Sequence, residues 1–191
     1  MVVLITGTST GIGYAIAELL ARNKYTVYAS MRNPHQSTAL QQLAKKEELD
    51  LHVLQLDVLY DDSVQKTVDT ILSKEDKIDV LINNAGVHAW GATEELPMEI
   101  FKDNMETNYF GTLRCIKAVL PSMREKKSGS IINITSIAGI VNSNFHGAYC
   151  ASKAAVEALT ESLAQELAPF NIRLALVEPA FIETPIFKKA N

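Results

Sequence analysis

The sequence predicts an α/β protein built on a doubly wound parallel sheet, and two features of the chain predict it. Short aliphatic and β-branched runs alternate with longer amphipathic segments along nearly all of the 191 residues. The short runs are almost continuously apolar, as expected of strands that are buried on both faces. Strands that alternate with helices form a parallel sheet with right-handed crossovers. We therefore expect a single domain over residues 1–191.

Each expected strand is a short aliphatic or β-branched run that stops at a turn residue. The first run is Val-Val-Leu-Ile-Thr and ends at Gly7. Branched side chains suit a pleated, buried surface, whereas glycine interrupts it. The six strands are expected, in chain order, at residues 2–6, 25–30, 51–56, 78–82, 130–135 and 172–177.

The helices are expected where apolar residues recur at intervals of three and four. Ile12, Ile16 and Leu19 have this spacing in the first helix. Two aspartates open the third helix and place negative charge at its positive end, and Pro169 stops the last one. The helices are expected at residues 12–23, 38–48, 61–74, a stretch that begins near Pro97, 106–125 and 148–168.

Six strands with intervening helices suit a three-layer, Rossmann-type sheet of strand order 3-2-1-4-5-6. In such a sheet, ligands bind outside the carboxyl ends of the strands. The turns that follow the strands are therefore where a functional site is expected.

The composition is that of a folded protein and excludes several kinds of partner. Hydrophobic residues make up 47% and charged residues 21%, and the formal net charge is −4. These values argue against disorder, and against nucleic acid or an anionic membrane as a partner. No apolar run reaches the roughly 20 residues that span a bilayer. The apolar stretch at the N-terminus is too short and too poor in charge for a signal peptide. A cytoplasmic location is therefore expected.

The two cysteines, Cys115 and Cys150, belong to no CxxC motif and to no Cys/His cluster. Free cysteine in a reducing compartment is usually a small buried hydrophobe. We therefore expect neither a disulfide nor a metal site.

A glycine-rich turn joins the first expected strand to the first expected helix. Its sequence is Gly7-Thr8-Ser9-Thr10-Gly11-Ile12-Gly13. Glycines let the backbone approach a pyrophosphate, and the free N–H groups and positive dipole of the helix N-terminus attract the phosphate charge. The spacing is GxxxGxG, not the usual GxGxxG, so in isolation a loose glycine turn is an equal alternative. Its position between strand and helix favours dinucleotide binding.

The end of the second expected strand bears on which dinucleotide is bound. An NAD enzyme usually has an acid there for the ribose 2′-hydroxyl, whereas this chain has Ser30-Met31-Arg32-Asn33. The Arg32 guanidinium can pair with a 2′-phosphate through a forked, charge-assisted hydrogen bond. A lone arginine is usually a surface residue, but together with the glycine turn this one favours NADP(H) over NAD(H).

Two further strand ends carry candidate cofactor contacts. Asp57 and Val58 close the third strand, and the carboxylate can accept from an adenine amino group or cap the following loop. Asn84, Ala85 and Gly86 close the fourth strand. The amide can satisfy backbone groups of neighbouring strands and the small residues leave room for a ligand, although a plain Asn/Gly turn is the alternative.

Tyr149 and Lys153 are the first candidates for catalysis. Because they are four apart on a helix, both can point into one cleft. A nearby ammonium favours the phenolate, so we expect the tyrosine pKa to fall from near 10 toward working pH. The YxxxK pattern is common by itself. Ser136, just past the fifth strand, strengthens it because a hydroxyl there can donate to a substrate oxygen, although a lone serine is more often a turn residue.

These motifs together resemble the short-chain dehydrogenase/reductase family. The glycine turn, the Asn83-Asn84-Ala85-Gly86 stretch, Asn108, Ser136 and the Tyr149/Lys153 pair occur in the family's order and approximate spacing. The resemblance covers essentially the whole chain, and the combination is far more specific than any one motif.

The resemblance implies hydride transfer between a nicotinamide and a carbonyl or secondary alcohol carbon. It implies Tyr149 as the general acid/base, and Lys153 as the residue that lowers the tyrosine pKa and binds the nicotinamide ribose. Ser136 would orient the substrate oxygen, and Asn108 would help to hold a proton-relay water.

The late part of the sequence departs from the family pattern. Pro179 and Thr184 resemble residues that pack on the nicotinamide and bind its carboxamide, but Ala180 stands where the family usually has glycine. Alanine resists positive φ, so the backbone there is expected to be slightly reshaped. The sequence ends at Asn191, so we expect it to lack the substrate-covering segment and seventh strand of the family, which leaves the sixth strand as a sheet edge.

Two loops are expected to line the substrate end, one after Gly86 and one between Ser136 and Tyr149. The candidate substrate contacts are His88, Trp90, Val141, Phe145 and His146. The histidines suit a polar substrate group, although loop histidines are more often surface or packing residues, and the aromatic rings suggest an apolar substrate. The chain looks most like the hydroxysteroid and retinol dehydrogenase branch, which implies a lipophilic alcohol or ketone; a 3-oxoacyl thioester reductase is the rival.

Two classes of function remain open at this point. The intact Ser136, Tyr149 and Lys153 favour an active NADP(H) oxidoreductase, whereas the early C-terminus favours a cofactor-binding module that is catalytically weak. The resemblance also implies a homodimer or higher homo-oligomer, because the family pairs the two long helices in a four-helix interface.

Overall fold

The sheet has the strand order that the sequence predicts. The computed structural model describes residues 1–184 and 186, so the expected domain end at Asn191 lies outside them. Within the described residues, six parallel strands form one sheet in the order β3-β2-β1-β4-β5-β6. The strands are β1 (Val2–Ile5), β2 (Thr26–Met31), β3 (Leu51–Gln55), β4 (Val80–Asn83), β5 (Gly129–Ile134) and β6 (Ile172–Val177).

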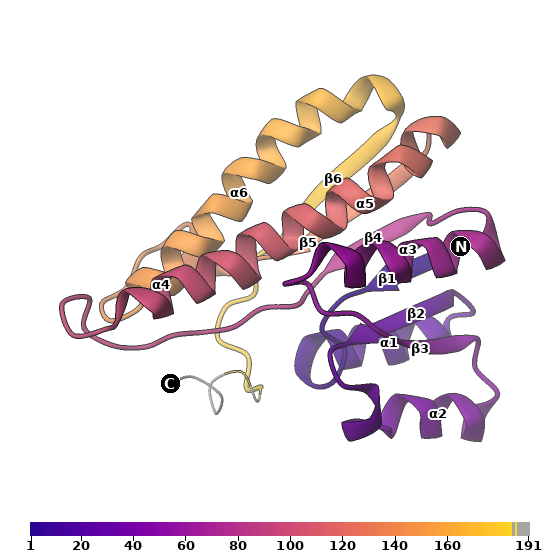
Figure 1. Cartoon of the computed structure of the whole chain (residues 1–191), viewed down its shortest axis with the longest axis horizontal. Coiled ribbons are helices and arrows are strands. Elements are labelled where there is room, and N and C mark those ends of the chain that lie inside the picture. Colours follow the sequence, from indigo (N-terminus) through magenta and orange to yellow (C-terminus); the bar gives the residue numbers. More distant parts are fainter. Residues whose placement is uncertain (185, 187–191) are drawn as a thin grey trace.

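Helices connect successive strands and lie on both sides of the sheet (Figure 1). The helices are α1 (Gly11–Arg22), α2 (Ala39–Glu47), α3 (Asp61–Glu75), α4 (Met98–Asn104), α5 (Gly111–Lys126) and α6 (Gly147–Leu167). Short 3-10 turns lie at Pro34–Gln36, Ile137–Gly139 and Ala168–Phe170.

Two apolar clusters make the sheet the middle of three layers. On one face, α1 and α2 place residues such as Ala17 and Leu40 against β1 and β2. On the other face, α3, α5 and α6 contribute residues such as Val68, Ile116 and Leu167. Burial on both faces explains why the strands are continuously apolar in sequence, and each fully buried aliphatic side chain contributes about 1.5–3 kcal/mol.

β6 lies at the edge of the sheet and is covered on one face only. Ile172 is buried and Leu174 half-buried, whereas Arg173 and Ala175 between and beyond them are exposed. α6 packs against this strand, and β5 is its one partner within residues 1–184 and 186. The position at the edge agrees with the prediction for the sixth strand.

The prediction that a helix starts at residue 106 is wrong. The chain is helical without a break from Met98 to Lys126, and Met105–Phe110 forms a π-helical turn inside this run. No proline or glycine interrupts the chain between Asn104 and Phe110, so the backbone stays helical and takes up extra residues as a wide turn. Such π-turns are frequent at functional sites.

Five of the six strands differ from the prediction by one or two residues at one or both ends, and only β6 has the predicted bounds. β2 begins at Thr26 because the Tyr25 N–H closes the end of α1 on the Leu20 carbonyl oxygen at 3.2 Å. β4 begins at Val80, two residues later than expected.

The described part of the chain lacks a membrane-spanning helix and a metal-binding cluster. No helix there has the length and apolar character needed to cross a membrane. No group of three or more His, Cys, Asp or Glu residues there is placed to hold a metal ion. Both cysteines are buried and free.

Candidate active site

A cavity of about 490 Å³ lies at the carboxyl ends of the strands. It extends from the glycine turn, past the ends of β2, β3 and β4, to the start of α6 and the segment after β6. The predicted cofactor residues that line it are Gly7, Ser9, Thr10, Gly11, Ile12, Arg32, Asp57, Val58, Asn84, Ala85, Gly86, Tyr149, Lys153, Pro179 and Thr184.

The glycine turn needs its glycines for backbone shape and for close packing. Gly7 and Gly11 have φ of +71° and +64°, a left-handed conformation that side chains disfavour. A Cβ on Gly7 would also lie 2.6 Å from the Ala85 Cα. The turn can therefore come close to the end of β4 and keep its backbone N–H groups near the cavity.

Thr8 and Gly13 build the turn and do not line the cavity. Thr8 is fully buried, and both its N–H and its hydroxyl donate to the Ser30 carbonyl oxygen, at 3.0 and 3.1 Å. A Cβ on Gly13 would lie 2.3 Å from Asn84 Nδ2. These two predicted cofactor residues hold the turn against β2 and β4.

Asn84 joins the glycine turn to the end of β4. Its Nδ2 donates to the carbonyl oxygens of Thr6 and Gly7 at 3.0 and 2.9 Å. In return, the Thr6 hydroxyl oxygen accepts from the N–H groups of Asn84 and Ala85, both at 3.0 Å. Thr6 was missed as a site residue, and the signal was a polar side chain at the end of a buried strand.

Arg32 and Asp57 end neighbouring strands, and both line the cavity. The Arg32 side chain is exposed and forms no ion pair with the described residues. The Asp57 carboxylate accepts from the Leu59 N–H at 3.1 Å, so it caps its own loop. Because Asp57 also lines the cavity, capping does not exclude the adenine contact.

Ser136, Tyr149 and Lys153 meet at the other end of the cavity. Ser136 follows β5, and its side chain caps the next 3-10 turn by accepting from the Ala138 N–H at 3.2 Å. Tyr149 and Lys153 lie one turn apart on α6. Lys153 is 6% exposed, and its Nζ donates to the Ile134 carbonyl oxygen at 3.0 Å.

The pKa of Tyr149 shifts in the direction opposite to the prediction. Burial raises it above its ordinary value, and a hydrogen bond with Ser136 offsets part of the rise. The Lys153 nitrogen lies 5.7 Å from the ring centre, and the pKa of Tyr149 is nevertheless raised. Burial in turn lowers the pKa of Lys153 to about 8.

Asn108, in the π-helical turn, is buried behind the cavity wall. Its Oδ1 accepts from the Val87 N–H at 2.8 Å, and its Nδ2 donates to the Val87 carbonyl oxygen at 3.0 Å. Nδ2 also donates to Ser152, whose hydroxyl donates to the Tyr149 carbonyl oxygen at 2.8 Å. Asn108 therefore links the Val87 segment of the wall to the helix that carries Tyr149. The role in proton relay stays a prediction.

Two of the five candidate substrate residues line the cavity and three do not. His88 and His146 line the cavity, and the His88 ring centre lies 4.7 Å from that of Tyr149. Burial lowers the pKa of His88, and the neighbouring His146 adds to that effect. Trp90, Val141 and Phe145 do not line the cavity. The apolar lining there that was not predicted comes from Ile137, Ala138, Phe181 and Ile182.

A doubly wound sheet with a glycine turn at its first strand is the architecture of Rossmann-type domains, and in this chain a Ser–Tyr–Lys set lines the same cavity as that turn. Comparison with known proteins agrees. The short chain dehydrogenase family model matches residues 1–191, and the chain belongs to the short-chain dehydrogenase/reductase family.

The relatives and solved structures described here are longer than this chain. It is 39% identical to 3-ketodihydrosphingosine reductase of Bacteroides thetaiotaomicron, over 96% of the chain and 64% of the relative. It is 40% identical to retinol dehydrogenase 8 of Homo sapiens, over 95% of the chain and 59% of the relative. The chain thus spans about three fifths of the length of these relatives.

Solved structures with the same fold include two oxidoreductases. A short-chain dehydrogenase from Streptomyces avermitilis aligns with a TM-score of 0.90 at 36% identity, over 98% of this chain and 69% of that one. An actinorhodin polyketide ketoreductase, solved with NADPH, aligns with a TM-score of 0.92 at 33% identity, over 97% of this chain and 72% of that one.

Proposed function

We propose that this chain forms the cofactor-binding and catalytic domain of an NADP(H)-dependent oxidoreductase that interconverts a carbonyl and a secondary alcohol. The observation that carries the proposal is one continuous cavity. The glycine turn and Arg32 line one end of it, and Ser136, Tyr149 and Lys153 line the other.

The cavity walls fit a dinucleotide. Gly7 and Gly11, with their left-handed backbone, let the turn come close to a pyrophosphate. Arg32 is an exposed cation that can pair with a 2′-phosphate. At the opposite end, a Cβ on Gly86 would lie 3.1 Å from the Asn108 Oδ1 and 3.7 Å from the Lys153 Nζ, so glycine there fits close to Asn108 and adds no side chain beside the lysine, where a ribose would bind. NADPH would supply the hydride, and the protein supplies orientation and proton transfer.

Tyr149 is suited to deliver a proton to a carbonyl oxygen. Since its pKa is raised, the phenol keeps its proton at neutral pH and is ready to act as a general acid in the reducing direction. The Ser136 hydroxyl, hydrogen-bonded to Tyr149, can share the same substrate oxygen. The Lys153 ammonium favours negative charge on Tyr149 once the proton has left.

We propose a lipophilic ketone or alcohol as the substrate. Ile137, Ala138, Phe181 and Ile182 give the substrate end an apolar wall, and retinol dehydrogenase 8 is among the relatives. A 3-oxoacyl thioester is the second candidate. It is favoured by His88 and His146 in the wall, because such a substrate carries a second oxygen that a histidine can bind.

NADPH titration followed by a panel of carbonyl substrates tests the proposal. Saturable NADPH binding with turnover of at least one carbonyl compound is expected. Binding without any turnover would favour the alternative of a catalytically weak cofactor-binding module, and no binding would contradict both. The cytoplasmic location and the homodimer stay predictions.

A further inference from the structure

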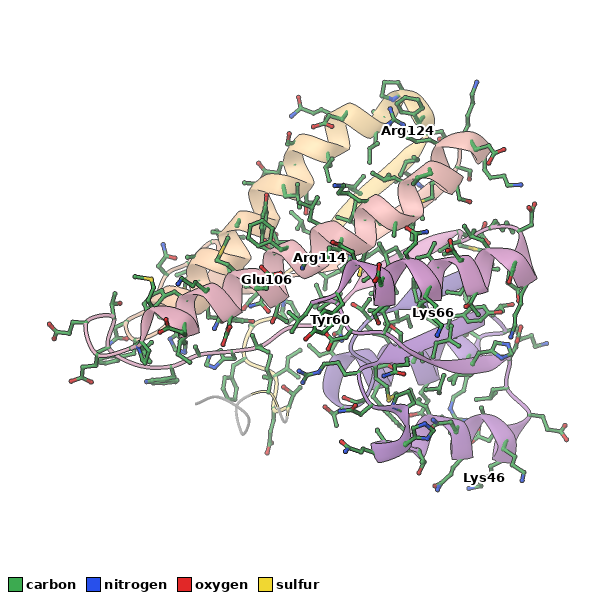
Figure 2. All side chains as sticks on the ribbon, viewed as in Figure 1. Lys46, Tyr60, Lys66, Glu106, Arg114 and Arg124 are labelled. Atoms are coloured by element: carbon green, nitrogen blue, oxygen red, sulfur yellow. The ribbon has the colours of Figure 1, made fainter. Side chains whose placement is uncertain are left out.

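Arg114 in α5 connects two parts of the site without lining the cavity itself. Its Nη1 donates to the Val58 carbonyl oxygen at 3.3 Å, and its Nη2 donates to the Glu106 carboxylate. Its Nε lies 3.1 Å from the Asp61 carboxylate. Figure 2 shows Arg114 and Glu106 along the same helical run, with Tyr60 on the neighbouring loop.

The loop that Arg114 contacts forms the cavity wall at the end of β3. Asp57, Val58 and Leu59 all line the cavity there. The loop's own bonds are local, because the Asp57 N–H donates to the Ser63 hydroxyl and the Asp57 carboxylate accepts from Leu59. These bonds shape the loop but leave open how it sits relative to the opposite wall.

The second hydrogen bond of the Arg114 guanidinium goes to the π-helical turn. Glu106 belongs to this turn, as do Thr107 in the cavity wall and Asn108 behind it. Close packing supports the same connection, since a Cβ on Gly111 would lie 2.8 Å from the Val58 Cγ2. The start of α5 therefore contacts the Val58 loop through both packing and a charged hydrogen bond.

The three interactions of Arg114 contribute unequally. The Asp61 side chain is 85% exposed, so its ion pair is screened by water and contributes little. The Arg114 and Glu106 side chains are 22% and 42% exposed, so this pair is only partly screened, and less so than the pair with Asp61. Only a planar guanidinium can hold these partners at once, and a lysine in its place would be a single point charge.

We propose that Arg114 is a positioning residue for the adenosine half of the dinucleotide. It holds the Asp57–Leu59 wall at a fixed place relative to the π-helical turn. This inference rests on the proposed function, because the wall can only position a dinucleotide that binds there.

The test compares Arg114→Met with Arg124→Met, a matched arginine later in the same helix that packs on Phe170, 4.1 Å from its ring centre. Calorimetry measures the affinity for NADPH, for adenosine 2′,5′-bisphosphate and for reduced nicotinamide mononucleotide. We expect Arg114→Met to weaken NADPH and the bisphosphate about tenfold each, because a displaced wall would cost the ligand about one charged hydrogen bond. The mononucleotide should stay within twofold, and Arg124→Met should change none of the three.

A second variant protects the test against a folding defect. Glu106→Gln removes only the partner charge, so a smaller loss confined to NADPH and the bisphosphate is expected. Unchanged NADPH affinity in both variants, or a loss that the mononucleotide shares, would overturn the positioning role. A wild-type protein that does not bind NADPH would instead refute the proposed function, and the inference with it.

Discussion

The Lys153 Nζ lies 5.7 Å from the centre of the Tyr149 ring, while its hydrogen bond goes to the Ile134 carbonyl oxygen at 3.0 Å. The lysine is thus a buried cation held by the end of β5, next to the tyrosine it is expected to assist. Burial lowers the pKa of the lysine to about 8 and raises that of the tyrosine. The two shifts have one cause, since desolvation disfavours whichever form is charged.

The Lys153 pKa makes stability depend on pH. The unfolded chain keeps this lysine protonated up to its ordinary pKa of 10.5, whereas the folded protein releases the proton near pH 8. Between these values the unfolded state binds more protons, so the free energy of unfolding rises with pH. Relative to Lys153→Met, the wild type should gain about 2 kcal/mol between pH 7 and pH 9.5. Denaturant unfolding at both pH values measures the gain, and parallel behaviour of the two proteins would contradict the buried cation.

Tyr149→Phe should separate chemistry from binding. The variant keeps the ring that packs 4.7 Å from His88 but loses the proton donor. Turnover should fall by about 10²–10⁴, the usual contribution of general acid–base catalysis, with NADPH affinity within about twofold. Steady-state kinetics and cofactor titration measure the two effects. Substantial residual turnover would show that another group supplies the proton.

The fold could be predicted from the sequence because its signals are local. Apolar runs and helical spacing specified six strands in the correct order, and Gly7 marked the turn at the end of β1. The position of the site followed, since parallel strands bring their carboxyl ends to one edge. The π-helical turn carries no breaker residue and was not predictable from spacing.

What the sequence could not provide depends on packing between distant segments. Thr6 and Asn84 are 78 positions apart and bond only when β1 and β4 pair. Arg114 is an ordinary helical arginine until α5 meets the Val58 loop. The direction of the Tyr149 pKa shift likewise depends on desolvation, which outweighs the hydrogen bond with Ser136 and has no sequence pattern.

Gly13→Ala should destabilise the protein although Gly→Ala inside a helix is usually favourable. The new methyl would lie 2.3 Å from Asn84 Nδ2 and 2.6 Å from the Gly7 carbonyl oxygen. Overpacking of this kind costs about 1–3 kcal/mol. Gly147→Ala is the control, because its methyl would meet only the exposed Thr93 hydroxyl, at 3.1 Å. Equal unfolding free energies for the two variants would contradict the tight contact at Asn84.

The oligomeric state can be measured directly. α4, the π-helical turn and α6 pack together, and Phe110 on this turn is 42% exposed. We expect a homodimer that covers the outer surface of the long helices. Light scattering should give twice the 21.0 kDa of one chain, and a mass of 21.0 kDa across the micromolar range would contradict the dimer.

Arg32 should decide between the two nicotinamide dinucleotides. Its exposed guanidinium lines the cavity with Ser9 and Thr10, so a 2′-phosphate would meet a cation there and a 2′-hydroxyl would not need one. A charge-assisted hydrogen bond contributes about 1.5–3 kcal/mol, so Arg32→Ala should weaken NADPH binding roughly 10- to 100-fold. NADH affinity should stay within about twofold, because NADH lacks the 2′-phosphate that we propose Arg32 binds.

Arg173→Ala is the matched control for this change, since Arg173 is an exposed arginine on β6 that does not line the cavity. It removes the same charge, so it measures any general effect of net charge on a polyanionic ligand. The selective loss should also shrink as salt rises, because ions screen an exposed pair. If Arg32→Ala and Arg173→Ala weaken NADPH equally, or if Arg32→Ala weakens NADH as much as NADPH, then Arg32 is a surface arginine and the preference for NADP(H) has another origin.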